Sequence, residues 1–332
     1  MPKFCAPLPS PKQIGQHVPL SERCKRFVLK ARATAQEIMT GRLARFVLFV
    51  GPCSIHSPRL ALDYAHKLRA LAAEVNDHFF LVMRVFLEKP RTQFGWKGFL
   101  YDPFLDDSLA VKEGLYHSRA LLCDLADVSI PVATEFLDPL LSHYSSDLIT
   151  WGMIGARTSA SQIHRQMASA LPMPIGFKND VNGHVDQAIF SALAARHPQT
   201  FTGINADGRL CAAKSVGNPY THIILRGGVT KSNYDSAAVA DALDKQRLFN
   251  LEAKLIVDCA HGNAQKQAEK QKKSFSSVVS QYRSGNRAIM GAMLESHLRK
   301  GRLLSLTDPC LDWETTQEMI LAACAILERS AS

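Results

Sequence analysis

The 332-residue sequence has eight cysteines but no pair spaced C-x-x-C. Their scattered positions (5, 24, 53, 123, 211, 259, 310 and 324) argue against a zinc ribbon and a thioredoxin-like motif. The sequence also lacks the continuous apolar core of a signal peptide and any apolar run long enough to span a bilayer. We therefore expect a cytoplasmic protein with free thiols and no membrane partner.

Acidic residues are fewer than basic ones, which gives a net charge of +9. Such a balance is compatible with nucleic-acid binding, but the lysines and arginines are spread along the whole chain. The densest run, 266–273, includes Glu269 and is typical of a solvated helix face. We expect no nucleic-acid partner, and the positive balance suits small, highly anionic substrates.

Eight short apolar segments predict β-strands at 45–50, 79–86, 130–137, 151–156, 174–178, 222–226, 254–260 and 288–294. Helical patterns lie between most of them, for example at 160–171, 184–197 and 235–249. This alternation predicts an α/β fold, a closed parallel (β/α)8 TIM barrel. A doubly wound open sheet is the alternative.

We divide the chain into an amino-terminal arm and helix, 1–44, and a catalytic barrel domain, 45–332. Residues 1–20 are proline-rich and are predicted to form an arm rather than a core element. Apolar residues at helical spacing predict a helix over 22–41. A β-hairpin is expected at about 200–216, inserted before the sixth strand of the barrel.

Cys53 follows the first predicted strand after a Gly-Pro turn. The carboxyl ends of parallel strands are where α/β proteins carry their chemistry, so the thiol is placed like a ligand or a nucleophile. A buried structural cysteine is the alternative. Charged residues in or just after all eight strands favour a functional site there.

These strand-end residues fall into two chemical groups. The cationic group suits phosphate and carboxylate, and implies an anionic ligand: Arg84, Lys89, Arg91, Arg157, Lys178 and Arg226. The second group offers sulfur, nitrogen and oxygen donors: Cys53, His261, Glu295 and Asp308. Its spacing matches no structural zinc site, but such a set can hold a divalent transition metal with an open position for a substrate oxygen.

Several longer motifs extend this pattern. They are GPCSIH (51–56), MRVFLEKPRTQFGWKG (83–98), EFLDP (135–139), WGMIGART (151–158), SQIHR (161–165), GFKN (176–179), HIILRGG (222–228), DCAHGN (258–263) and LESHL (294–298). In sequence and order they resemble the type I 3-deoxy-D-arabino-heptulosonate-7-phosphate (DAHP) synthases, from about residue 45 to 330.

This resemblance implies an enzyme, a transferase that condenses phosphoenolpyruvate with D-erythrose 4-phosphate and releases phosphate. It is the first step of the shikimate pathway, which leads to chorismate and the aromatic amino acids. The resemblance also implies one divalent metal ion, manganese first, with iron, cobalt or zinc as alternatives. Family members are dimers or tetramers, so we expect a homodimer or homotetramer.

The resemblance assigns roles to residues by motif position. The metal ligands fall on Cys53, His261, Glu295 and Asp308. The phosphoenolpyruvate contacts fall on Arg84, Ala156, Arg157, Lys178 and Arg226, with Glu135 near the reacting carbon. The aldose phosphate contacts fall on Lys89, Pro90, Arg91 and Thr92. We expect the catalytic group to comprise Arg84, Lys89, Glu135, Lys178 and His261.

The carboxyl-terminal part of the chain departs from the family pattern. The stretch between Glu295 and Asp308 is short, and Pro309 stands where a small residue is usual. Asp312 is therefore a competing ligand, unless it caps the last helix. Two other functions stay open: a related synthase that uses another aldose phosphate, and a catalytically silent homologue.

The amino-terminal arm generates a prediction about regulation. In family members that respond to aromatic amino acids, this arm and the inserted hairpin help to form the effector site. The arm is short here, and Pro172 sits in a loop near that region. We expect weak or absent inhibition by phenylalanine, tyrosine or tryptophan in titrations with each amino acid. Strong inhibition by any one of them contradicts this prediction.

Overall fold

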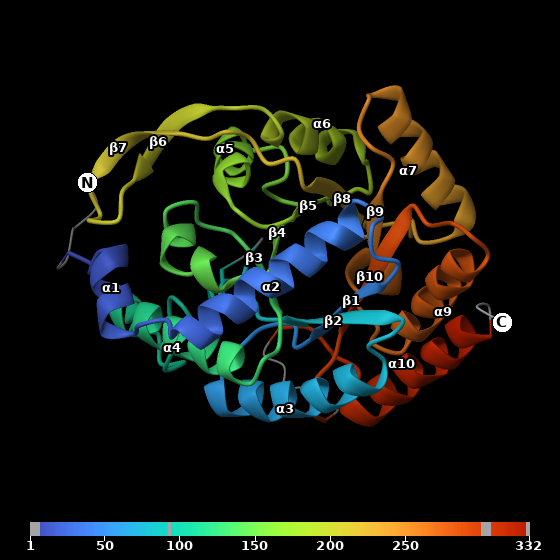
Figure 1. The fold of residues 1–332 in the computed structure, drawn as a ribbon, viewed down its shortest axis with the longest axis horizontal. Helices are drawn as coiled ribbons and strands as arrows, with labels where there is room; N and C mark the ends of the chain where they lie inside the picture. The colour runs from blue at the N-terminus through green and yellow to red at the C-terminus, as the bar shows by residue number, and fades with distance from the viewer. Residues whose placement is uncertain (1–6, 92–93, 300–306, 330–332) are drawn as a thin grey trace.

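Eight parallel strands close into a barrel in the computed structural model, which describes residues 7–91, 94–299 and 307–329 (Figure 1). Their order around the barrel is β1-β10-β9-β8-β5-β4-β3-β2. The strands are β1 (Phe46–Gly51), β2 (Phe79–Arg84), β3 (Val132–Glu135), β4 (Trp151–Ile154), β5 (Ile175–Lys178), β8 (Thr221–Leu225), β9 (Leu255–Asp258) and β10 (Ile289–Glu295). The predicted (β/α)8 fold is confirmed, and the open-sheet alternative is wrong.

Helices connect the strands and surround the barrel (Figure 1). They are α1 (Pro11–His17), α2 (Glu22–Met39), α3 (Pro58–Glu74), α4 (Val111–Asp127), α5 (Gln162–Ala170), α6 (Asp186–Ala195), α7 (Ser236–Leu248), α8 (His261–Ala264), α9 (Lys270–Arg283) and α10 (Trp313–Glu328). The 3-10 helices η1 (Leu141–Tyr144) and η2 (Ser146–Leu148) lie between β3 and β4. No helix in the described part of the chain is long and apolar enough to cross a membrane.

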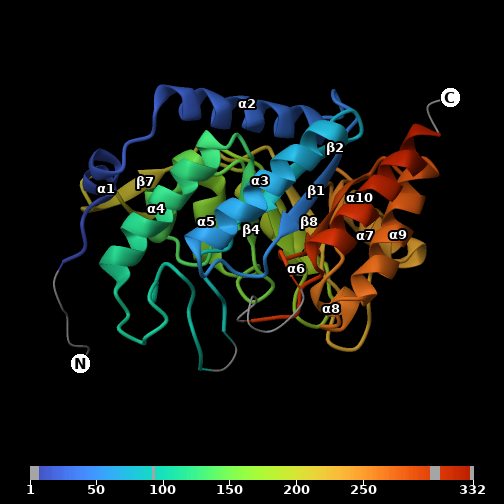
Figure 2. The same cartoon turned by 90° about the horizontal axis from the view of Figure 1, so that it is seen from below.

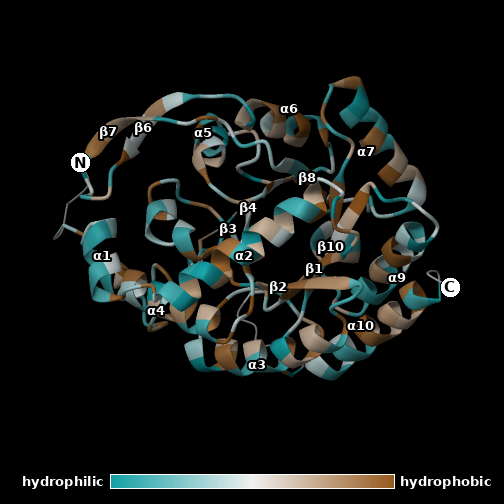
Figure 3. Ribbon diagram, viewed as in Figure 1, coloured by the Kyte–Doolittle hydropathy of each residue, from teal (hydrophilic) through white to brown (hydrophobic). Residues whose placement is uncertain are grey.

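The side chains of a barrel strand point alternately into two hydrophobic cores, one inside the barrel and one under the surrounding helices. On β1, Val47 and Phe49 face the inside of the barrel and pack with Trp151. Leu48 and Val50 belong to the larger core under the surrounding helices. Strand β1 is buried on both faces and carries no polar side chain, and the brown of most of β2 shows the same apolar character (Figure 3).

Helix α2 lies across the amino end of the barrel (Figure 2). Its residues Ala35, Ile38 and Met39 are buried against the inner core. Because α2 closes this end, the strand ends that carry Cys53 and Glu295 open at the other end, among the long loops.

The inserted hairpin consists of β6 (Thr200–Ile204) and β7 (Leu210–Lys214), which form a separate antiparallel sheet. The amino-terminal α1 packs beside its turn, since the Lys12 backbone N–H donates to the Ala206 carbonyl at 2.9 Å. The prediction that residues 1–20 hold no core element is wrong, because Ile14 of α1 is fully buried. Ser10 and Gln13 cap the helix reciprocally, a signal that the sequence carries.

The burial of Ile14 predicts a stability effect. Ile14→Ala removes three side-chain carbons at a site with no exposed surface, so it is expected to lower the free energy of unfolding by about 2–4 kcal/mol in urea titrations. Leu29→Ala is the control, because Leu29 is 54% exposed and its loss is expected to change this energy by less than about 0.5 kcal/mol. Equal effects of the two substitutions contradict the role of α1 in the core.

Candidate active site

The turn after β1 brings the Cys53 thiol into a buried polar cluster. Gly51 ends the strand with φ +151°, and a Cβ at this position would lie 3.1 Å from the Arg84 carbonyl oxygen. Cys53 is fully buried. Its sulfur lies 2.9 Å from the Thr307 hydroxyl, 3.3 Å from Lys89 Nζ and 3.5 Å from Asp308 Oδ2.

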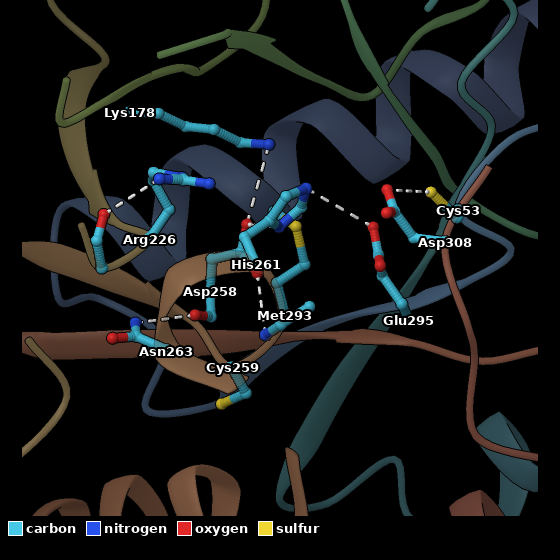
Figure 4. A network of polar contacts seen from close by, with 12 residues as sticks. Cys53, Lys178, Arg226, Asp258, Cys259, His261, Asn263, Met293, Glu295 and Asp308 are labelled. Atoms are coloured by element: carbon cyan, nitrogen blue, oxygen red, sulfur yellow. Dashed lines mark hydrogen bonds and ion pairs between the residues drawn. The ribbon is translucent and has the colours of Figure 1, made fainter. Parts of the chain in front are cut away.

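The four predicted metal ligands lie together at the carboxyl end of the barrel (Figure 4). Donor atoms of Cys53, Glu295 and Asp308 lie within 4.8 Å of one another. His261 Nε2 lies 3.6 Å from Glu295 Oε1. Donors that share one ion are typically about 3–4 Å apart, given bonds of roughly 2.0–2.3 Å. The three donors of Cys53, Glu295 and Asp308 can therefore reach a single divalent ion, and His261 lies beside them at Glu295.

The orientation of His261 supports this fit. Its backbone has φ +50°, and its Nδ1 lies 2.9 Å from the buried Asp258 carboxylate. A carboxylate at Nδ1 fixes the ring tautomer and leaves Nε2 as the free donor, which is how metal-binding histidines are usually held. Asp258 is the first residue of the motif DCAHGN, but neither the motif nor the resemblance assigned it a role.

Asp312, the competing ligand, has a different role in the structure. Its side chain accepts a hydrogen bond from the Thr315 backbone N–H at 2.8 Å and caps α10. Asp308 instead lies beside Cys53. The geometry favours Asp308 over Asp312 as the fourth donor.

Three buried cations surround the ring of Phe86. Arg84, Lys178 and Lys89 lie 4.1, 5.5 and 5.9 Å from its centroid. The negative face of an aromatic ring attracts cations, so Phe86 helps to hold like charges close together. The ring is a part of the site that the sequence analysis missed.

Carboxylates balance these cations. Arg84 donates to Glu295 Oε1 at 2.9 Å, and Lys178 donates to Glu135 Oε2 at 3.0 Å. Lys178 also lies 3.7 Å from Asp258. A side chain at Gly155 would collide with Glu135, since its Cβ would lie 2.4 Å from Oε1. This close approach explains why a glycine, Gly155, follows β4.

Electrostatics keep two of these carboxylates ionised. Burial raises the pKa of Asp258 and Glu135, but neighbouring charges outweigh it. His261 and Lys178 lower the pKa of Asp258, and Lys178 lowers the pKa of Glu135. Burial, followed by the charge of Glu295, raises the pKa of the Cys53 thiol to about 11. The pKa stays raised although Lys89 lies 3.3 Å from the sulfur and lowers it, so a thiolate at neutral pH needs a further positive ion beside it.

Arg226 lies beside the same cavity as His261, Glu295 and Asp308. Asn179 positions it by accepting its backbone N–H at 2.7 Å. Burial lowers the pKa of Arg226, and the nearby charge of Arg157 acts in the same direction. Arg157 is exposed and Ala156 is half-buried, both after β4.

The loop after β2 carries the other predicted contacts. Lys89 is buried and donates to the Cys53 carbonyl at 3.0 Å. Pro90 is half-buried and Arg91 is exposed. Thr92 lies outside the described residues. The structure thus joins Lys89 to the cluster and places Arg91 at its outer edge.

Two further residues organise the site without having been predicted. Gln271 of α9 holds Glu295 through both backbone groups, with hydrogen bonds of 2.8 and 3.1 Å. Glu88 accepts the backbone N–H groups of Asp138 and Leu137 at 3.2 and 3.4 Å. The sequence carried a signal for Glu88, because this residue follows an apolar run and lies beside Lys89. Nothing in the sequence pointed to Gln271.

The cavity at this site is much smaller than two other cavities of the protein. The cavity beside His261 and Asp308 measures about 30 Å³, enough for an ion or a water molecule. A cavity of about 810 Å³ lies at the amino end of the barrel, against Phe27 and Phe80, and includes no predicted site residue. Pro172 and Phe201 line a third, of about 110 Å³, next to the hairpin. Of these three cavities, the largest therefore lies away from the predicted site residues.

Comparisons with known proteins agree with these features. The model of the DAHP synthetase I family matches residues 26–324. The Tyr-sensitive phospho-2-dehydro-3-deoxyheptonate aldolase of Salmonella typhimurium is 43% identical over 325 residues, covering 94% of this chain and 91% of its own length. The Trp-sensitive enzyme of Escherichia coli is 40% identical over 324 residues, covering 94% and 93%.

A solved structure is similar over nearly the whole chain. The phospho-2-dehydro-3-deoxyheptonate aldolase of Francisella tularensis superimposes with a TM-score of 0.96 at 37% identity, and the match covers 99% of each chain. The names of the similar enzymes cite different aromatic amino acids, so they leave the predicted weak inhibition of this chain as a prediction.

Glu88 predicts a pH dependence of stability. Burial raises the pKa of Glu88 from 4.5 to about 8. Between pH 4.5 and 8, the folded state therefore keeps the proton of this carboxyl group, whereas the unfolded state releases it. The free energy of unfolding is therefore expected to fall as pH rises from about 5 to 8, by at most about 1.4 kcal/mol per pH unit. Glu88→Gln should flatten this slope in urea titrations, whereas the exposed Glu113→Gln should not. An unchanged slope in Glu88→Gln contradicts the assignment.

Proposed function

The chain belongs to the DAHP synthetase I family, and on this premise we propose that its barrel condenses phosphoenolpyruvate with D-erythrose 4-phosphate, giving DAHP and phosphate. The observation that carries the proposal is one cluster at the strand ends. There the sulfur, nitrogen and oxygen donors of Cys53, His261, Glu295 and Asp308 adjoin the buried cations Arg84, Lys89 and Lys178.

We propose that Cys53, His261, Glu295 and Asp308 hold one divalent ion, manganese first, with iron, cobalt or zinc as alternatives. The mixed donor set supports a transition metal rather than calcium or magnesium, which prefer oxygen ligands alone. When bound, the ion supplies Lewis-acid polarisation of the aldehyde oxygen. The residues around it perform the binding and proton-transfer steps.

Phosphoenolpyruvate is proposed to lie against Arg84, Ala156, Arg157, Lys178 and Arg226. Arginine forks and a lysine suit its carboxylate and phosphate. Glu135 is bonded to Lys178 at 3.0 Å and therefore lies beside the proposed position of the reacting carbon. This cradle would offset the repulsion between two anionic substrates and hold them face to face.

The aldose phosphate is proposed to contact Lys89, Pro90, Arg91 and Thr92. The enol carbon of phosphoenolpyruvate attacks the aldehyde carbon, and water adds to the resulting cationic centre. The phosphate then leaves as the hemiketal collapses. Lys89 Nζ lies 3.3 Å from Cys53 Sγ and thus beside the proposed metal site, so Lys89 or a histidine adjacent to the metal is proposed to handle the proton of the new alkoxide.

Other features of the protein stay predictions. They include assembly as a homodimer or homotetramer, a location in the cytoplasm, and the identity of the metal ion. The silent-homologue alternative is less favoured, because every predicted ligand and phosphate-binding cation is present in the sequence. The other-aldose alternative is addressed by the choice of substrate below.

The first experiment measures metal-dependent phosphate release from phosphoenolpyruvate. With erythrose 4-phosphate, we expect turnover that a chelator abolishes and a divalent metal restores. With arabinose 5-phosphate, we expect turnover at least about a hundredfold lower, since a differently sized aldose misplaces the reacting carbon. Equal turnover with both sugars contradicts the specificity, and no turnover with either contradicts the activity.

The two aspartates give a matched test of the metal site. Asp308→Asn is expected to lower both bound metal and kcat by at least about a hundredfold, because a donor is lost. Asp312→Asn is expected to keep both and to lose only about 1 kcal/mol of stability, as a weakened helix cap does. Metal content is measured by elemental analysis after dialysis. Loss of metal from Asp312→Asn alone reverses the assignment.

A further inference from the structure

A second group of metal-type donors lies at the amino end of the barrel, at the end opposite to Cys53. His78, in the turn before β2, faces Cys324 and Glu328 of α10, and donor atoms of the three lie within 4.8 Å of one another. They come from two elements that are far apart in the chain. Neither the barrel chemistry nor the proposed reaction uses them.

The distances in this group suit a shared ion. Cys324 Sγ lies 3.6 Å from Glu328 Oε1. A sulfur and an oxygen bound to one tetrahedral ion, at about 2.3 and 2.1 Å, are separated by about 3.6 Å. The residues are four apart on α10, so one face of the helix presents both. A weak S–H···O hydrogen bond would account for this pair, but not for the imidazole beside it.

The backbone holds His78 in place. Its carbonyl accepts the Phe46 N–H at 2.8 Å and its own N–H donates to the Val75 carbonyl at 3.2 Å, which ties the turn to β1 and α3. In the described part of the chain, no hydrogen bond or ion pair is formed by its imidazole. Cys324 is 6% exposed, whereas Glu328 is exposed and leaves the group open to solvent.

We propose that His78, Cys324 and Glu328 form a second metal site, selective for a zinc-class divalent ion. Imidazole nitrogen, thiolate sulfur and carboxylate oxygen are each donors that zinc and cobalt(II) accept, and a water would complete four-coordination. Binding replaces the thiol proton, which leaves to solvent, by a sulfur–metal bond. The ion joins the end of α10 to the turn before β2, and so clamps the last helix to the first half of the barrel.

Cobalt(II) titration of the full chain tests this site, with the sulfur-to-cobalt charge-transfer absorption as the readout. Both sites contain one cysteine, so the wild type is expected to bind two ions. Cys53→Ser and Cys324→Ser are each expected to bind one, and the double variant none. Cys211→Ser, in the hairpin outside both groups, is the matched control and is expected to keep two.

Two further measurements separate the site from a folding defect. In the Cys53→Ser background, His78→Asn and Glu328→Gln are expected to weaken cobalt binding at least tenfold, while circular dichroism stays unchanged. Cobalt is expected to raise the Tm of Cys53→Ser but not of Cys53→Ser/Cys324→Ser. The proposal is overturned if Cys53→Ser binds no cobalt, or if Cys324→Ser keeps the wild-type stoichiometry. Neither result bears on turnover at the barrel mouth.

Discussion

Arg84 and Glu295 are both buried and lie 2.9 Å apart, and much of the barrel mouth depends on this pair. Each charge alone would carry a desolvation cost of several kcal/mol. Together they also fix their neighbours: Arg84 lies over Phe86, and Glu295 faces His261. Gln271 completes the arrangement by binding the backbone of Glu295 on both sides. A change at either charge would therefore leave the other uncompensated, and disturb the metal and phosphate groups together.

The barrel explains why such charges can be assembled at all. Strands β1, β9 and β10 of the barrel are buried along their whole length, so their side chains are shielded from solvent on both faces. The polar residues at or just after the carboxyl ends of β1, β9 and β10 then meet at one mouth, where they compensate one another. Residues that are remote in the chain thus become neighbours through strand order, and β1 pairs with β10 to bring Cys53 beside Glu295.

Most of the fold and the membership of the donor cluster could be predicted from the sequence, because both follow local patterns. Strand limits were less certain: the run 130–137 was predicted where β3 covers Val132–Glu135, since Phe136 stays buried beyond the strand end. An apolar run does not distinguish a strand from a buried loop. Gln271 and Phe86 could not be assigned roles, because their roles arise only from contacts between distant elements. Asp258 illustrates the same limit: its position at a strand end was visible, but the 2.9 Å approach of its carboxylate to His261 Nδ1 arises in a turn where His261 has φ +50°.

The charge balance of the mouth also constrains how substrates enter. The buried cations Arg84 and Lys178 already have carboxylate partners, Glu295 and Glu135. Arg226 instead donates to the neutral Gly227 carbonyl, at 3.1 Å. If phosphoenolpyruvate binds as proposed, its phosphate gains most from Arg226, which forms no ion pair with a carboxylate of the described residues, and the paired cations supply a fixed positive background. Pairing in the free protein thus preorganises Arg84 and Lys178 at their positions, so that binding energy is not spent on ordering them.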